Sequence, residues 1–267
     1  MVKPLAFFSR DVRIELSYPV AFTIRIVSIF FTVFFYFFLS RLIGDAATPY
    51  LEAYGGDYFA FVLIGLALQG YYSTGLQSFA RNVREAQMTG TLEAMLLTPT
   101  RLSTIILSSG IFDYLFTTIQ IVVAIVVGAA LVGLSFQGAN FKAALLVLLL
   151  NIIAFSGIGV IAASFITVLK RGDPVTWFFN SMATLLAGTF YPIEIMPIWL
   201  QWISHLIPLT YGVRAMRLAL LAKASAHELL PDMLMLLAFC LVLVPLSLFI
   251  FRWAVNRARV DGSLTFY

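Results

Sequence analysis

The chain has 267 residues, of which 61% are hydrophobic, 15% aromatic and only 11% charged, and its mean hydropathy is +0.96. A soluble domain could not bury so much apolar surface, so the composition predicts an integral membrane protein. The formal net charge is +4, but the basic residues are scattered at the ends of apolar runs, which argues against nucleic-acid binding. The single cysteine, Cys240, excludes an intramolecular disulfide and a cysteine metal site.

The first segment, residues 1–19, has the pattern of an amphipathic helix. Its apolar residues recur at spacings of three and four from Leu5 to Leu16, while Arg10 occupies another face. We expect an interfacial helix in the inner headgroup layer that ends at Pro19, where the chain turns into the bilayer. A disordered, charged tail is the alternative.

Six apolar runs follow that can cross about 30 Å of hydrocarbon, a distance that takes about 20 helical residues. They occupy residues 20–43, 58–79, 105–134, 141–169, 175–191 and 233–253, and the fifth is the shortest. When the N-terminus is placed inside, most lysines and arginines near the span ends also lie inside, as the positive-inside rule requires. The predicted fold is therefore an all-α membrane protein with six transmembrane helices and both termini cytoplasmic.

A charged segment, residues 80–104, separates the second and third runs. Within it, residues 84–97 have an apolar face opposite a polar one. The apolar face consists of Met88, Leu92, Met95 and Leu96, and the polar residues away from it include Glu85, Gln87 and Glu93. We predict a short cytoplasmic helix that Thr98 and Pro99 end. The exposed apolar face requires cover by a lipid surface or by a protein groove, and the pattern alone does not choose between them.

Polar residues inside the apolar runs are few. Asp113 lies about 12 Å into the third span, where a charge is costly. It either belongs to a substrate or gating path or pairs with Arg25 of the first span, and the pairing is the favoured interpretation. Interhelical hydrogen bonds are expected from Gln69, Gln120, Asn151 and Asn180.

The region before the last span, residues 192–222, is apolar but interrupted. Three prolines interrupt it: Pro192, Pro197 and Pro208. Pieces of about ten residues reach only about 15 Å, roughly half a bilayer. We therefore predict two re-entrant or interfacial half-helices, at 198–206 and 209–221. A plain extracellular loop is the alternative, although loops rarely carry residues such as Trp199 and Trp202.

Two stretches resemble a known family. The run REAQMTGTLEAMLLTPTR, residues 84–101, resembles the cytoplasmic coupling helix of the ABC-2 family, the transmembrane subunits of type V ABC exporters. The run YPIEIMPIWLQWISHLIPLTYGVRAMR resembles the family's other hallmark, with Pro208, Leu209, Tyr211 and Arg217 at the expected spacing. The resemblance extends over the length, span count and topology of the chain, so residues 1–267 are predicted to form one transmembrane domain.

This resemblance implies an export permease subunit in a bacterial-type cytoplasmic membrane, for a drug, a lipid or a lipid-linked glycan. Two permease subunits would pair with two copies of a cytoplasmic ABC ATPase, and the second permease is expected to be another copy of this chain, although a heterodimer stays open. The sequence has no GxxxxGK[ST] motif, so this chain is not expected to be an enzyme or to bind a cofactor. ATP and Mg²⁺ would be bound by the partner ATPase, and membrane lipid is the remaining partner.

The resemblance also assigns candidate site residues. The ATPase-coupling residues are Arg84, Glu85, Met88, Leu92, Glu93, Met95 and Leu96. In the resembled family the first and fifth spans help to line the translocation route. The possible translocation path comprises Tyr36, Asp113, Glu194, Trp199, Trp202, Tyr211 and Arg217. Tyr36 belongs to the phenylalanine-rich run 30–38, for which simple lipid contact is the favoured interpretation. No metal site is predicted.

A second functional class is a self-sufficient ion-coupled secondary transporter or channel. Against it, the spans lack several buried charges in relay spacing and show no obvious inverted repeat. A membrane-embedded enzyme is weaker still, because the sequence has no HExxH or GxSxG motif. No residue names the transported molecule.

Overall fold

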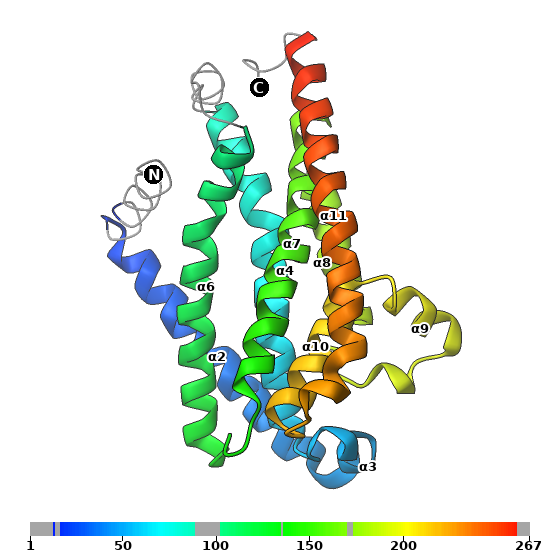
Figure 1. Ribbon diagram of the computed structural model, residues 1–267. Coiled ribbons are helices and arrows are strands. Elements are labelled where there is room, and N and C mark those ends of the chain that lie inside the picture. Colours follow the sequence, from blue (N-terminus) through cyan, green and yellow to red (C-terminus); the bar gives the residue numbers. More distant parts are fainter. Residues whose placement is uncertain (1–12, 14–16, 89–101, 135, 170–172, 261–267) are drawn as a thin grey trace.

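The computed structural model describes residues 13, 17–88, 102–134, 136–169 and 173–260 (Figure 1). Within these ranges every regular element is helical. The long helices are α2 (Pro19–Ile43), α4 (Tyr58–Met88), α6 (Leu102–Val132), α7 (Phe141–Leu169) and α11 (Ala226–Val260). The shorter ones are η1 (Gly44–Ala47), α3 (Thr48–Leu51), η2 (Glu52–Tyr54), α8 (Asp173–Leu186), η3 (Ile193–Ile195), α9 (Ile198–Ser204) and α10 (Pro208–Leu220). The all-α prediction is confirmed for the described residues.

Five helices are long and apolar enough to cross a membrane, among the residues described. They are α2, α4, α6, α7 and α11. Helix α4 has 31 residues and is therefore about 46 Å long, which exceeds the hydrocarbon thickness by several turns. It continues to Met88 without a break, whereas the sequence pattern placed the end of this span at residue 79.

The expected fifth crossing, residues 175–191, is not one continuous helix. Helix α8 has only 14 residues, about 21 Å, and ends at Leu186. Gly188 then adopts a φ of +77°, a left-handed conformation that favours glycine, and Pro192 cannot continue a helix hydrogen-bond ladder. The prediction of six long spans is therefore not confirmed, because the last residues of this region, after Leu186, form a turn and not a helix.

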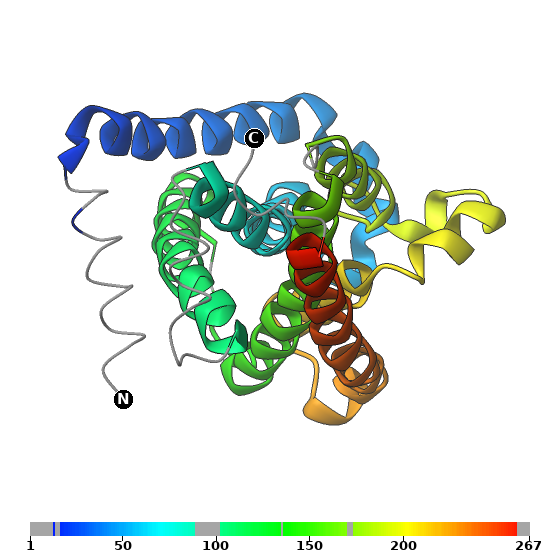
Figure 2. The same ribbon diagram turned by 90° about the horizontal axis from the view of Figure 1, so that it is seen from above.

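Two short helices, α9 and α10, occur close to the predicted half-helices. Pro208 is the first residue of α10, where a helix does not need the missing N–H, so this proline starts a helix and does not interrupt one. Helix α9 extends away from the helix bundle in both Figure 1 and Figure 2, while α10 packs inside it.

The packed core lies among α4, α7, α10 and α11. Tyr72 of α4 meets Phe155 of α7 edge to face, with ring centroids 5.2 Å apart. Helices α4 and α7 cross so closely that a Cβ on Gly159 would overlap the carbonyl oxygen of Gly75. Small residues permit such backbone contact between membrane helices.

Helix α2 lies apart from this core. Seen from above in Figure 2, it runs along one side of the bundle, where it contacts α6 and α4. Only 6% of the most apolar stretch of α2 is buried, against 72% of the corresponding stretch of α4. The exposed surface of α2 is therefore available for contact with lipid or with another protein. The predicted interfacial helix at 1–19 lies outside the described residues, apart from Arg13 and Ser17 and the start of α2.

Candidate functional site: a polar pocket between α2, α4 and α6

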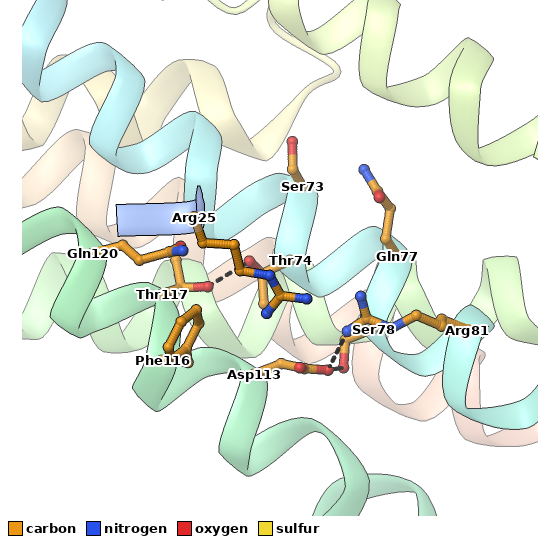
Figure 3. A pocket seen from close by; sticks show the side chains of 10 residues that line it. All are labelled: Arg25, Ser73, Thr74, Gln77, Ser78, Arg81, Asp113, Phe116, Thr117 and Gln120. Carbon is orange, nitrogen blue, oxygen red and sulfur yellow. Dashed lines mark hydrogen bonds and ion pairs between the residues drawn. The ribbon is translucent and has the colours of Figure 1, made fainter. Parts of the chain in front are cut away.

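A cavity of about 330 Å³ lies between α2, α4 and α6, and Figure 3 shows the ten side chains that line it. All of them fall within the candidate spans, yet only Phe116 is apolar. The lining consists of Arg25, Ser73, Thr74, Gln77, Ser78, Arg81, Asp113, Phe116, Thr117 and Gln120. Polar side chains within a membrane span face the protein interior or water and mark functional sites by default. This pocket is therefore the candidate functional site.

Helical spacing brings the lining residues together. On α4 four of the five lining positions are Thr74, Gln77, Ser78 and Arg81, and on α6 the positions are Asp113, Phe116, Thr117 and Gln120. Each set follows the spacing i, i+3, i+4, i+7, which places all four residues on one helix face. The two faces meet, and a polar stripe on each helix becomes a polar wall of one cavity.

Asp113 is held by two residues of α4. Its carboxylate accepts a hydrogen bond from the Ser78 hydroxyl and forms an ion pair with Arg81, 2.9 Å from Nη2. The Arg81 side chain is 57% exposed and that of Asp113 is 20% exposed, so the pair lies at the open edge of the pocket. The favoured interpretation had paired Asp113 with Arg25. Arg25 does line the same pocket, but the 2.9 Å ion pair is with Arg81.

The remaining walls are fixed by hydroxyls and rings. The hydroxyls of Thr74 and Thr117 lie 2.7 Å apart in a hydrogen bond that joins α4 to α6. From α2, the Arg25 guanidinium carbon lies 5.5 Å from the ring centroid of Phe116, within cation–π range. Phe22 also contacts this ring, with centroids 5.9 Å apart. The α4 and α6 walls are therefore joined by a hydrogen bond, whereas Phe22 and Arg25 of α2 close the third side by contact with the Phe116 ring.

A second polar site is enclosed in the core around Arg217 of α10. This side chain is only 3% exposed. Its Nε donates to the Phe61 carbonyl at 3.0 Å, and Nη1 and Nη2 donate to the carbonyls of Gly188 and Thr189, each at 2.7 Å. The guanidinium carbon also lies 3.3 Å from the Phe61 ring centroid. One arginine thus joins α4, α10 and the turn after α8.

Hydrogen bonds also tie α8 to α4. Gln69 donates to Asn180 at 3.3 Å and to Thr184 at 2.9 Å, and it accepts from Thr189 at 3.3 Å. Ser73 donates to the same Asn180 oxygen at 2.7 Å. The expected interhelical hydrogen bonds of Gln69 and Asn180 are confirmed. The short α8 is held against α4 by this network.

The residues predicted for the translocation path fall in separate places. Asp113 lies in the pocket, whereas Tyr211 and Arg217 are buried on α10 and Tyr36 stacks on Phe190 with centroids 5.6 Å apart. The exposed residues among them are Glu194 of η3 and Trp199 and Trp202 of α9. The structure therefore does not gather these seven residues into one site, and their contact with a substrate stays a prediction.

Tyr54, close to the Arg217 site, is affected both by burial and by nearby charges. Tyr54 of η2 packs against Phe61 and is buried. Burial is the main cause that raises the pKa of the Tyr54 phenol above its ordinary value, and the Glu194 carboxylate raises it further. The Tyr54 phenol is therefore neutral at neutral pH.

The predicted coupling residues lie at and beyond the end of α4. Arg84 is half-buried in the last turns of the helix, which also contain Glu85 and Met88. The other four lie outside the described residues: Leu92, Glu93, Met95 and Leu96. Their contacts with an ATPase stay a prediction.

Six residues of the pocket were not singled out from the sequence. They are Ser73, Thr74, Gln77 and Ser78 of α4 and Phe116 and Thr117 of α6. For Thr74, Gln77 and Ser78 the signal was present, because these residues share helical spacing with Arg81, but it lay in a span read only for its hydrophobicity. Among the described residues, no group of three or more His, Cys, Asp or Glu side chains could hold a metal ion.

The fold and the pocket define a helical, multi-pass membrane protein with polar groups between its spans. The sequence model of the ABC-2 type transporter family matches residues 8–221, so the chain belongs to that family. It is 25% identical over 189 residues to the inner membrane transport permease YadH of Escherichia coli strain K12, a match that covers 70% of each protein. Proteins of the same name from Escherichia coli O157:H7 and Shigella flexneri match to the same extent. The family resemblance seen in the two sequence motifs is confirmed.

Proposed function

We propose that this chain is the membrane-spanning permease subunit of an ATP-driven ABC exporter. It moves an amphipathic drug, lipid or lipid-linked glycan out of the cytoplasm or the inner leaflet. The observation that carries this proposal is the family match over residues 8–221, which covers the long helices around the polar pocket and both sequence motifs. Similarity to proteins named inner membrane transport permeases supports the inner membrane as its location.

The energy for transport comes from a separate subunit in this proposal. The sequence has no Walker A motif, so ATP and Mg²⁺ are bound by a cytoplasmic ABC ATPase present in two copies. Two permeases complete the assembly, most simply two copies of this chain. The largely exposed apolar surface of α2, together with Phe178 and Phe179 on α8, supports a membrane-embedded partner surface.

The arrangement of α4 and α6 supports a direct route from ATPase to pocket. Residues 89–101 connect the end of α4 to the start of α6, and these two helices form two walls of the cavity. Movement of this segment on an ATPase surface would displace both walls as rigid elements. Glu85 and Glu93 would pair with basic groups of the ATPase, and the apolar face would fill its groove.

The proposed topology keeps both termini in the cytoplasm. The C-terminal ends of α4 and α11 lie toward one end of the molecule, and α3 lies toward the other (Figure 1). Helix α8 supplies a fifth, partial crossing, and α9 and α10 form an outer re-entrant region before the last span. The buried donors of Arg217 fix this region to α4, which supports a positioning role for Arg217.

Copurification and ATPase measurements test the proposal. Leu92→Asp combined with Glu93→Arg is expected to abolish assembly with a Walker-motif ATPase and the substrate-stimulated ATPase activity. The matched control is Leu42→Asp combined with Glu52→Arg, which makes the same changes at exposed positions near the opposite end of the molecule. Unchanged assembly and activity in the first variant would refute the coupling assignment. Proton- or sodium-driven transport by the purified chain alone would refute the exporter and establish an ion-coupled carrier.

A further inference from the structure

We propose that the pocket between α2, α4 and α6 binds the anionic headgroup, a phosphate or a carboxylate, of an amphipathic molecule. This inference rests on the proposed function, because it names the chemical class that the permease admits.

The charge of the pocket selects an anion. Two guanidinium groups, Arg25 and Arg81, face one carboxylate, Asp113, so the lining carries one net positive charge. The carboxylate is already engaged by Ser78 and Arg81. A cationic ligand would therefore meet an occupied carboxylate and a net positive lining, whereas an anion is attracted by that charge and can accept further N–H donors of the guanidinium groups.

The pocket also supplies neutral donors. Within the described part of the chain, the amides of Gln77 and Gln120 make no hydrogen bond to another residue. They come from opposite walls, α4 and α6. Figure 3 shows both side chains among those that surround the cavity together with Arg25. Amide N–H groups and a guanidinium are donors to the oxygens of a tetrahedral or planar anion.

Size and opening fit a headgroup attached to an apolar tail. A volume of about 330 Å³ lies at the lower end of the range for ligand pockets and holds a headgroup rather than a whole lipid. Arg25 is exposed, and its helix, α2, forms the side wall that faces away from the packed core. The exposed rings of Phe30, Phe31 and Phe34 lie on this same helix. A tail can therefore stay beside α2 in the bilayer while the headgroup enters the pocket.

Binding of dodecyl phosphate to the full chain in phosphatidylcholine nanodiscs tests this site without any ATPase. We expect saturable binding of dodecyl phosphate, and at least tenfold weaker binding of dodecylphosphocholine, whose headgroup has no net charge. Arg25→Gln is expected to weaken dodecyl phosphate binding at least tenfold, and Arg25→Lys by less. Asp113→Asn is expected to strengthen it several-fold, since it raises the net positive charge of the pocket; a purely structural role of the ion pair predicts no gain.

Arg41→Gln is the matched control, because Arg41 also lies on α2 and over a ring, 5.3 Å from the Phe37 centroid, but outside the pocket. It should leave binding unchanged. If Arg25→Gln does not fold, Gln120→Leu replaces it, with several-fold weaker binding expected. Millimolar inorganic phosphate distinguishes the sources: failure to compete indicates a headgroup with its tail, and full competition a free-anion site.

Equal binding of the two amphiphiles, or equal losses in Arg25→Gln and Arg41→Gln, would overturn the proposal. These outcomes are separate from the exporter proposal, which stands or falls on the ATPase partner.

Discussion

Arg217 and Arg25 place the same guanidinium group in two opposite surroundings within one membrane protein. Arg217 is enclosed in the core and donates to three backbone carbonyls, whereas Arg25 is exposed at the edge of a cavity and lies over one aromatic ring. The guanidinium of Arg217 therefore donates its hydrogen bonds to groups of the protein itself. The comparison indicates that Arg217 uses its charge to hold the helices together, while the arginines of the pocket between α2, α4 and α6 lie where a ligand can reach them.

The largest effect is expected from Arg217→Met. This change leaves the carbonyls of Phe61, Gly188 and Thr189 without their donors in a buried site. An unsatisfied buried acceptor costs about 1–3 kcal/mol, so the variant should lose several kcal/mol of stability and most of its folded yield. Thermal unfolding and gel filtration in detergent measure both. Arg217→Lys should fall between parent and Arg217→Met, and a Met variant within about 1 kcal/mol of the parent would contradict the enclosed role.

Gly65→Ala probes the same enclosed site from α4. A Cβ at this position would overlap the Thr189 carbonyl oxygen and lie 2.5 Å from Arg217 Nη2. Overpacking of this kind costs about 1–3 kcal/mol, which thermal unfolding would report as a lower midpoint. Gly70→Ala is the matched control on the same helix, because its nearest neighbour, Ile121, would lie 3.7 Å from the new Cβ. That variant should be neutral or stabilised by up to about 1 kcal/mol, as alanine is the better helix former.

A double-mutant cycle on Gln69→Leu and Asn180→Leu measures how firmly α8 is attached to α4. The 3.3 Å hydrogen bond between these amides predicts a coupling energy of about 0.6 to 1.7 kcal/mol in unfolding experiments. Gln69→Leu combined with Gln120→Leu is the control. The two glutamines belong to different sites, so their effects should add, and a coupling as large as that of the first pair would remove the distinction between network and pocket.

Much of this fold was readable from hydrophobic runs, because a bilayer demands about 20 apolar residues for each crossing. The run at 141–169 corresponds to α7 residue for residue. The prediction of a continuous fifth span was wrong, because the apolar composition continues past Leu186, whereas the backbone at Gly188 and Pro192 does not continue the helix. The apolar composition of a segment indicates that it lies in the bilayer, whereas here the conformation of Gly188 and the proline at 192 determine where the helix ends.

The candidate site was predicted in part. Asp113 was singled out because a carboxylate in a span is costly, but its partner was not found, since Arg81 had been assigned to the cytoplasmic segment. That error followed from ending the second span at residue 79, two residues before Arg81, although α4 continues to Met88. The pairing of α4 with α6 could not be derived from one sequence, because several helices offer faces with the same spacing.

The smallest effect on stability is expected from Asp113→Asn. The Arg81 side chain is 57% exposed, so the pair resembles a surface ion pair, whose loss costs at most about 1 kcal/mol. The Ser78 hydroxyl can donate to an asparagine oxygen as it does to the carboxylate, so no buried donor is left unpaired. Thermal unfolding should therefore barely change, in contrast to Arg217→Met. Asp232→Asn is the control at the other end of the molecule, where the carboxylate lies 3.7 Å from Arg214 and is only 6% exposed. A loss of several kcal/mol in Asp113→Asn would show that the pocket, like the Arg217 site, is built for architecture.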